Sequence, residues 1–176
     1  MLKKKVEEAL NNQIEVEAFS SQLYLSMASW CNSNGFPGAA QFLYTQTEEE
    51  RLHMLKIFHY INEKGGHAVV PALKKPQDKF KSVINIFEEV LKHEQYVTST
   101  IDKLMEVCMT EKDYTTANFL QWYVNEQIEE ESTAQGIIDR IKLIGKEPSA
   151  LYLIDVELEN ILAKKLKAAV ANTAQK

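Results

Sequence analysis

Mostly apolar and small residues recur along this chain at alternating steps of three and four, the spacing of a helix face that packs into a bundle. We call each such row of positions a seam. The first seam predicts a helix over residues 6–34, which a Gly-Phe-Pro-Gly run ends. The second predicts a helix over residues 38–64, which stops at a pair of glycines. The two seams pass through positions 6, 10, 13, 17, 20, 24, 27 and 31, and then through Leu43, Gln46, Glu50, His53, Ile57 and Tyr60.

The segment over residues 65–79 has no helical period and contains two glycines and two prolines, so we expect a loop there. Fully extended, such a segment reaches about 50 Å. A helix of the length of the second one spans only about 40 Å. The loop can therefore cross the whole bundle, which would make the second and third helices parallel.

The remaining chain carries further seams that predict helices over residues 80–109, 113–144 and 148–170. A single helix over residues 80–144 would be about 97 Å long, too long for a 20.1 kDa domain, so we place a turn at residues 109–113. Pro148 suits the first turn of the last helix. We expect one all-α domain over residues 1–176, a four-helix bundle with one long crossover and a short fifth C-terminal helix.

Composition narrows the classes of protein that this chain can belong to. A hydrophobic share of 45% is enough for one sizeable core, and 25 acidic against 20 basic residues argue against nucleic-acid binding. The two cysteines are too few for a disulfide scaffold or a thiolate metal site. We find no signal peptide and no long apolar run, so we expect no membrane partner and a cytoplasmic protein.

Six of the polar residues on the seams stand out, because the core of a helical bundle should exclude such side chains. Each lies near the middle of its helix, so the helices should bring all of them into one layer across the bundle. Buried carboxylates are almost never left unpaired. The six are Glu17, Glu50, His53, Glu94, Gln127 and Glu130.

Four carboxylates within a few ångströms repel one another, and they either take up protons or need cations between them. Two divalent metal ions would balance their charge. The spacing suits metal binding, because His53 follows Glu50 by three residues and Glu130 follows Gln127 by three, so each pair projects from one face of its helix.

Two metal-free interpretations remain open for these residues. The seams can be displaced by one position, so that the acids face water and the chain is a helical interaction module. All four helices would have to be displaced together for this to hold. Alternatively, a buried polar network would have to neutralise four acids with one histidine and one glutamine, because no Lys or Arg lies on a seam.

The motifs Glu17, Glu50-Arg51-Leu52-His53, Glu94 and Gln127-Ile128-Glu129-Glu130 resemble the ferroxidase ligands of bacterial non-haem ferritins, and the resemblance covers essentially the whole chain. It implies an iron storage protein that oxidises Fe(II) to Fe(III) at an intrasubunit di-iron centre, with dioxygen or hydrogen peroxide as oxidant. The iron would be deposited as a mineral inside a homo-oligomeric cage of about 24 subunits.

The resemblance implies a first iron held by Glu17, His53 and a bridging Glu50, and a second held by Glu50, Glu94 and Glu130. Related di-iron enzymes have a second Glu-x-x-His where this chain has Gln-x-x-Glu, so only one position has a nitrogen ligand. The second iron should therefore bind more weakly and behave as a passing substrate.

Further roles follow from the same resemblance. Gln127 would lie on the oxygen-binding side, and Tyr24 would support the centre by a hydrogen bond and by electron donation. Arg51 stands where bacterioferritins carry a haem-ligating Met, so no haem is expected. An accessory iron site that faces the cavity would use Glu130 with three more acids, although these also suit a solvated acidic face. The three are Glu49, Glu126 and Glu129.

Two rival classes within the same fold are less compatible with the sequence. A rubrerythrin-like oxidase or peroxidase would carry a Cys-x-x-Cys segment and a second Glu-x-x-His. A mini-ferritin binds metal between subunits, whereas one chain here supplies a complete set of ligands. Outside the site, we expect His93 to lie at the surface, Trp122 to serve packing, and Met109 to fill gaps in the core.

Overall fold

The computed structural model consists of five α-helices and describes residues 2–145 and 148–173, a part of the chain in which it has no β-strand. The helix bounds lie within three residues of those expected from the seams. The fifth helix has 26 residues and is nearly as long as the second, which has 27, although a short one was expected. The helices are α1 (Lys4–Ser33), α2 (Pro37–Glu63), α3 (Val83–Thr110), α4 (Tyr114–Ile144) and α5 (Pro148–Thr173).

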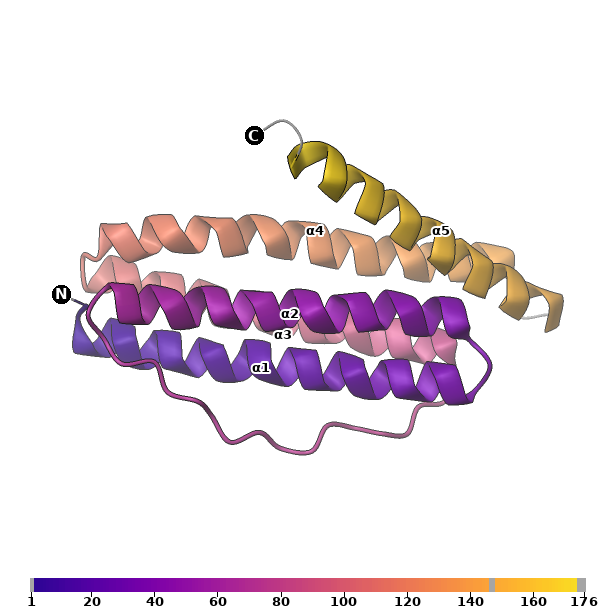
Figure 1. Ribbon diagram of the computed structural model, residues 1–176, viewed down its shortest axis with the longest axis horizontal. Helices are drawn as coiled ribbons and strands as arrows, with labels where there is room; N and C mark the ends of the chain where they lie inside the picture. The colour runs from indigo at the N-terminus through magenta and orange to yellow at the C-terminus, as the bar shows by residue number, and fades with distance from the viewer. Residues whose placement is uncertain (1, 146–147, 174–176) are drawn as a thin grey trace.

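The crossover between α2 and α3 runs along the outside of the bundle beside α1 and makes α2 and α3 parallel (Figure 1). Side chains of α1 hold it at both ends. Asn11 Oδ1 accepts a hydrogen bond from the Val69 backbone N–H at 2.8 Å, and Ser26 Oγ donates to the Gln77 carbonyl at 2.7 Å. The loop is therefore a strap tied to α1, and it crosses the bundle as its length and its lack of helical period predict.

The turn between α3 and α4 lies where the length argument places it, although neither Gly nor Pro marks it. Lys112 has a φ of 55°, the left-handed conformation that reverses a chain after a helix. Asp113 then begins α4, because its carboxylate accepts a hydrogen bond from the Thr116 backbone N–H at 3.1 Å. Together, Lys112 and the Asp113 cap divide what would otherwise be one overlong helix into α3 and α4.

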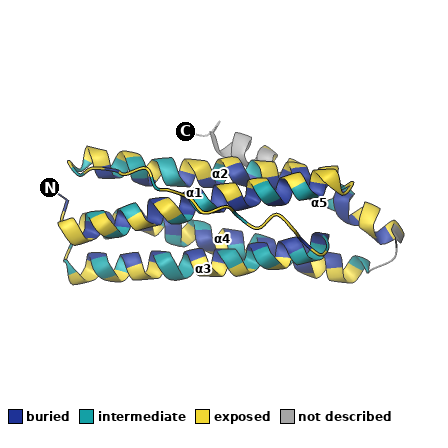
Figure 2. Ribbon diagram, turned by 90° about the horizontal axis from the view of Figure 1, so that it is seen from below, coloured by how far each residue is buried: buried dark blue, intermediate teal, exposed yellow. Residues whose placement is uncertain are grey.

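The hydrophobic core is divided into two clusters, one toward each end of the bundle. One includes Tyr24, Leu43 and Phe87, and the other includes Ile14 and Leu120. Buried residues line the inner faces of α1–α4 between them (Figure 2). The polar seam residues occupy the layer between the clusters. The apolar core is therefore interrupted by polar side chains where the sequence predicts the site.

The position of Met109 differs from our expectation. Its side chain is 54% exposed, although its neighbour Cys108 is buried in the cluster that includes Ile14 and Leu120. Met54 and Met105 pack against that cluster.

Helix α5 packs against α2 and α4, and one buried carboxylate joins it to the start of α2. Asp155 accepts hydrogen bonds from the backbone N–H groups of Gly38 at 3.0 Å and Ala39 at 2.9 Å. These groups have no partner within α2, and the start of a helix favours a negative charge. The absence of a side chain at Gly38 permits the contact, since a Cβ there would lie 2.3 Å from the Asp155 carbonyl oxygen.

We therefore expect Gly38→Ala to lower the free energy of unfolding by about 1 to 3 kcal/mol, because the backbone of α5 has to move away. The matched control is Gly136→Ala in α4, where an added Cβ meets nothing within 4 Å. It should stabilise the helix by about 1 kcal/mol. Urea unfolding of the iron-free protein measures both, and equal stabilisation by the two variants would contradict this position of α5.

Candidate metal centre

Glu17, Glu50 and His53 form a compact group of metal-binding side chains in the polar layer. One ligand atom from each lies within 4.8 Å of the other two. His53 Nδ1 is 3.4 Å from Glu50 Oε2 and 3.9 Å from Glu17 Oε2, and all three residues are buried. Glu50 and His53 come from successive turns of α2, and Glu17 comes from the adjacent α1.

Glu94 of α3 and Gln127 of α4 lie together on another side of the layer. Gln127 Nε2 donates to Glu94 Oε2 at 3.0 Å and to the Glu94 backbone carbonyl at 3.2 Å. The Tyr24 hydroxyl donates to the other carboxylate oxygen of Glu94. The carboxylate of Glu94 is therefore oriented by two donors from two different helices.

Glu130 is also buried in the layer, and its two oxygens have separate partners. Gln46 Nε2 donates to Oε2 at 2.9 Å, and the ammonium group of Lys165 lies 3.4 Å from Oε1. The six seam residues are thus all buried, and the four helices bring them into one layer, as the sequence predicts.

The electrostatics of the layer favour protons or cations. Burial raises the pKa of Glu17 and of Glu50 well above the ordinary value, and neighbouring carboxylates add to the effect. Burial also raises the pKa of Glu94, and it raises that of Glu130 to about 7. Without a metal ion these raised pKa values favour protonated acids, which is the response expected of crowded, buried carboxylates.

Two glutamines complete the hydrogen bonding of the layer, and the sequence analysis did not single them out. Gln13 Nε2 donates to Glu17 Oε1 at 2.8 Å, and Gln46 serves Glu130. Each lies on a seam one turn before a carboxylate of its own helix, which was a signal available in the sequence. In the described part of the chain, every buried side-chain nitrogen and oxygen has a hydrogen-bond partner.

Aromatic side chains and His93 enclose the layer. The rings of Trp122 and His53 form a T-shaped pair with centroids 5.2 Å apart, which agrees with the expected packing role. The expectation of a surface His93 was wrong. Its ring packs edge-on against Tyr24, Nε2 is 2.8 Å from Ser20 Oγ, and burial lowers its pKa to about 4. The step off the seam turns this half-buried ring toward Ser20 of α1.

The three further acids lie beside the layer, and a lysine of α5 contacts one of them, Glu49. We use the name accessory groove for the surface formed by Gln46, Glu49, Glu126, Glu129 and Glu130. Burial raises the pKa of Glu126, and the carboxylates of Glu129 and Glu49 raise it further. Glu49 is half-buried and Glu129 is exposed, so only part of the expected cluster is shielded from water.

Lys165 was missed by the sequence analysis. Its Nζ lies 2.6 Å from Glu49 Oε2 and 3.0 Å from Gln46 Oε1. Although no Lys or Arg occupies a seam of the four long helices, α5 brings a cation to the layer from outside. The carboxylates of Glu130 and Glu49 raise the pKa of Lys165 against the effect of burial, so it is charged.

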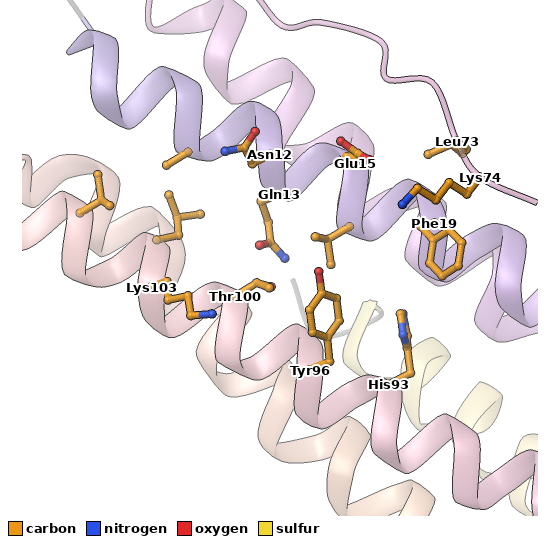
Figure 3. Close-up of a pocket in the computed structure, with 14 residues that line it drawn as sticks. Asn12, Gln13, Glu15, Phe19, Leu73, Lys74, His93, Tyr96, Thr100 and Lys103 are labelled. Carbon is orange, nitrogen blue, oxygen red and sulfur yellow. The ribbon is translucent and has the colours of Figure 1, made fainter. Parts of the chain in front are cut away.

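A cavity of about 690 Å³ lies between α1, α3 and the crossover on the side away from α5 (Figure 3). Tyr96 and His93 form part of its α3 wall, and Lys74 of the crossover lies at its rim. Gln13 lines the cavity and also donates to Glu17. One side chain therefore connects this cavity with the polar layer.

Comparison with known proteins places this arrangement among close relatives. A family model for the ferritin-like domain matches residues 7–144. The bacterial non-heme ferritin of Campylobacter jejuni is 46% identical over 167 residues, which are 95% of this chain and 100% of that protein. The bacterial non-heme ferritin of Escherichia coli O6:H1 is 42% identical over 161 residues, 92% of this chain and 98% of that protein.

The fold has equally close relatives among solved structures. An open pore ferritin from the archaeon Archaeoglobus fulgidus matches with a TM-score of 0.88 and 43% sequence identity. The match covers 90% of this chain and 96% of that chain.

In the described residues, no helix is long and apolar enough to cross a membrane.

Proposed function

This chain belongs to the ferritin family, and we propose from that premise that it is an iron storage protein with ferroxidase activity. The observation that carries the proposal is the convergence of Glu17, Glu50 and His53 in a buried layer, where burial raises the pKa of both carboxylates well above the ordinary value. Carboxylate oxygens and one imidazole nitrogen suit ferrous iron, and anionic oxygens favour Fe(III) once it forms.

We propose that the layer binds two Fe(II) substrate ions. We assign the first to Glu17, His53 and Glu50, and the second to Glu50, Glu94 and Glu130. Glu50 suits the bridging role, because its carboxylate interacts with those of Glu17, Glu94 and Glu130. The protein's part is to keep the ions about 3.5 to 4 Å apart, so that each gives one electron and dioxygen is reduced to the level of peroxide.

The two iron positions differ in strength, and the difference suits storage. Only the first has a nitrogen ligand, while the second has carboxylate oxygens alone, so iron should leave the second position more readily. Tyr24 and Gln127 hold the Glu94 carboxylate from two sides, and this orients a ligand of the weaker position. Oxidised iron then hydrolyses and moves to a mineral.

We further propose that the chain assembles into a closed homo-oligomeric shell of about 24 subunits that encloses the mineral. The family and the open pore relative support assembly. Helix α5 supports assembly as well, because it docks on its own bundle and still has exposed apolar side chains on its other faces. Leu151, Tyr152 and Leu153 are all exposed there.

Aerobic addition of Fe(II) to the iron-free protein tests the proposal. We expect ferric absorbance to rise much faster than in protein-free buffer, and we expect the iron to co-elute with protein at the size of a large assembly in gel filtration. Oxidation no faster than in buffer would refute the ferroxidase activity, and elution at monomer size would refute the shell.

A further inference from the structure

The amine of Lys165 occupies a place in the accessory groove that has the donor set of a cation site. Its three acceptors are Gln46 Oε1 at 3.0 Å, Glu49 Oε2 at 2.6 Å and Glu130 Oε1 at 3.4 Å. They come from two helices, and the side chain of Lys165 is only 24% exposed. Carboxylate and amide oxygens gathered in this way are the ligands that hard metal cations use.

The position of Lys165 follows from how α5 is docked. Asp155 fixes α5 at Gly38, the second residue of α2, and the two helices run in the same general direction from that point (Figure 1). Lys165 lies about 15 Å further along α5, and Glu49 lies about 16 Å further along α2. The two residues therefore reach the same height, and the long lysine side chain bridges the angle by which the helices diverge.

Lys165 also restrains a carboxylate of the second iron position. One oxygen of Glu130 accepts from Gln46 and the other faces the ammonium, so neither oxygen is free of a partner. A metal ion in the groove would need the same oxygens of Glu49 and Glu130. A metal ion and the ammonium group would therefore compete for these oxygens, and the repulsion between two cations in a half-buried site adds to the competition.

We propose that Lys165 is a tethered competitor for the accessory groove, and that a metal ion binds there only after displacing its ammonium group. The proposal rests on the proposed function, because iron that enters and leaves the di-iron layer would pass beside this groove. Lys165 is then a specificity-determining residue. It lowers the affinity of the groove for divalent ions, while more highly charged ions such as Fe(III) displace it more readily.

Zinc binding to the iron-free protein tests this without any redox reaction. Isothermal titration should show the wild type binding Zn²⁺ in the layer and only weakly in the groove. Lys165→Met keeps the stem and removes the charge, so we expect Zn²⁺ to bind at least tenfold more tightly in the groove. The matched control is Lys164→Met, because Lys164 is an exposed neighbour and its loss should leave both affinities unchanged.

The added binding must come from the groove. The double variant Lys165→Met/Glu49→Gln should lose it, and Lys165→Arg should behave as the wild type because the charge is kept. Lys165→Gln provides a second neutral variant if the methionine variant does not assemble. In a zinc-soaked crystal of the wild type, the Lys165 side chain should be turned away wherever the groove holds metal.

The two hypotheses fail in different ways. If Lys165→Met and Lys165→Gln bind Zn²⁺ in the groove no more tightly than the wild type, the competitor role is wrong while binding in the layer stands. If a crystal shows metal and the Lys165 ammonium together on Glu49, displacement is also wrong. A layer that neither binds Zn²⁺ nor oxidises iron would instead refute the proposed function.

Discussion

Glu50→Gln should slow aerobic Fe(II) oxidation by at least about 100-fold. Loss of a side chain that only orients a metal ligand typically costs 10- to 100-fold. Glu50 is assigned to both iron positions, so its loss removes a ligand from each and also the link that fixes their separation. Stopped-flow absorbance of ferric iron measures the rate at equal protein and iron concentrations.

Two neighbouring acids on the same helix provide controls. Glu48 is exposed, and Glu48→Gln should oxidise iron at the rate of the wild type. Glu49→Gln should have only a small effect, since Glu49 contacts Lys165 rather than the layer. The assignment of Glu50 is wrong if its replacement costs no more than that of Glu48.

The second large effect concerns the stability of the metal-free protein, which should fall as pH rises from about 5 to 8. The folded-state pKa of Glu130 is about 7, above its ordinary value of 4.5, so the folded state binds its proton more tightly than the unfolded chain does. This contribution is complete below the unfolded pKa and is lost as pH rises through 7. For Glu130 alone the loss is about 3 kcal/mol.

The other carboxylates of the layer act in the same direction. Burial is the largest cause of the raised pKa of Glu17, Glu50 and Glu94, so each resists losing its proton in the folded state. A bound divalent ion reverses the dependence, because it favours the ionised carboxylates. Melting temperatures of metal-free and Zn²⁺-loaded protein, measured across this pH range, should therefore diverge as pH rises.

Glu50→Gln provides a control for the stability effect as well. The amide removes one buried acid, so the metal-free variant should lose less stability than the wild type toward high pH, although it is inactive. A metal-free wild type that becomes more stable from about pH 5 to 8 would contradict this account. A Glu50→Gln variant that is inactive but still folded would also show that its loss of activity does not come from unfolding.

These expectations describe a layer that serves metal binding at a cost in stability. The apolar clusters on either side hold the bundle together, with fully buried side chains such as Leu10 and Phe87. Glutamine donors at Gln13 and Gln46 offset part of the cost, because they satisfy carboxylate oxygens that would otherwise lack partners. Such a trade of stability for activity is common at functional sites.

Much of this protein follows from sequence alone, because the relevant signals are local to each helix. The three-and-four spacing predicts the helices, and the length of the crossover predicts parallel α2 and α3. Polar residues at mid-helix seam positions, such as Glu17 and Glu94, predict a buried layer. Here the periodicity of a helix already determines which side chains face the core.

Contacts between side chains of different helices were decided only by the tertiary structure, because the period of one helix carries no information about its neighbour. The place of Lys165 depends on the angle and height at which α5 crosses α2, and these are set by Asp155 and Gly38, 117 positions apart in the chain. The hydrogen bond between Tyr24 and Glu94 and the inward turn of His93 likewise depend on how α1 and α3 pack. A seam fixes the face of a helix that is buried, but the partner of each buried side chain depends on the packing of helices against one another.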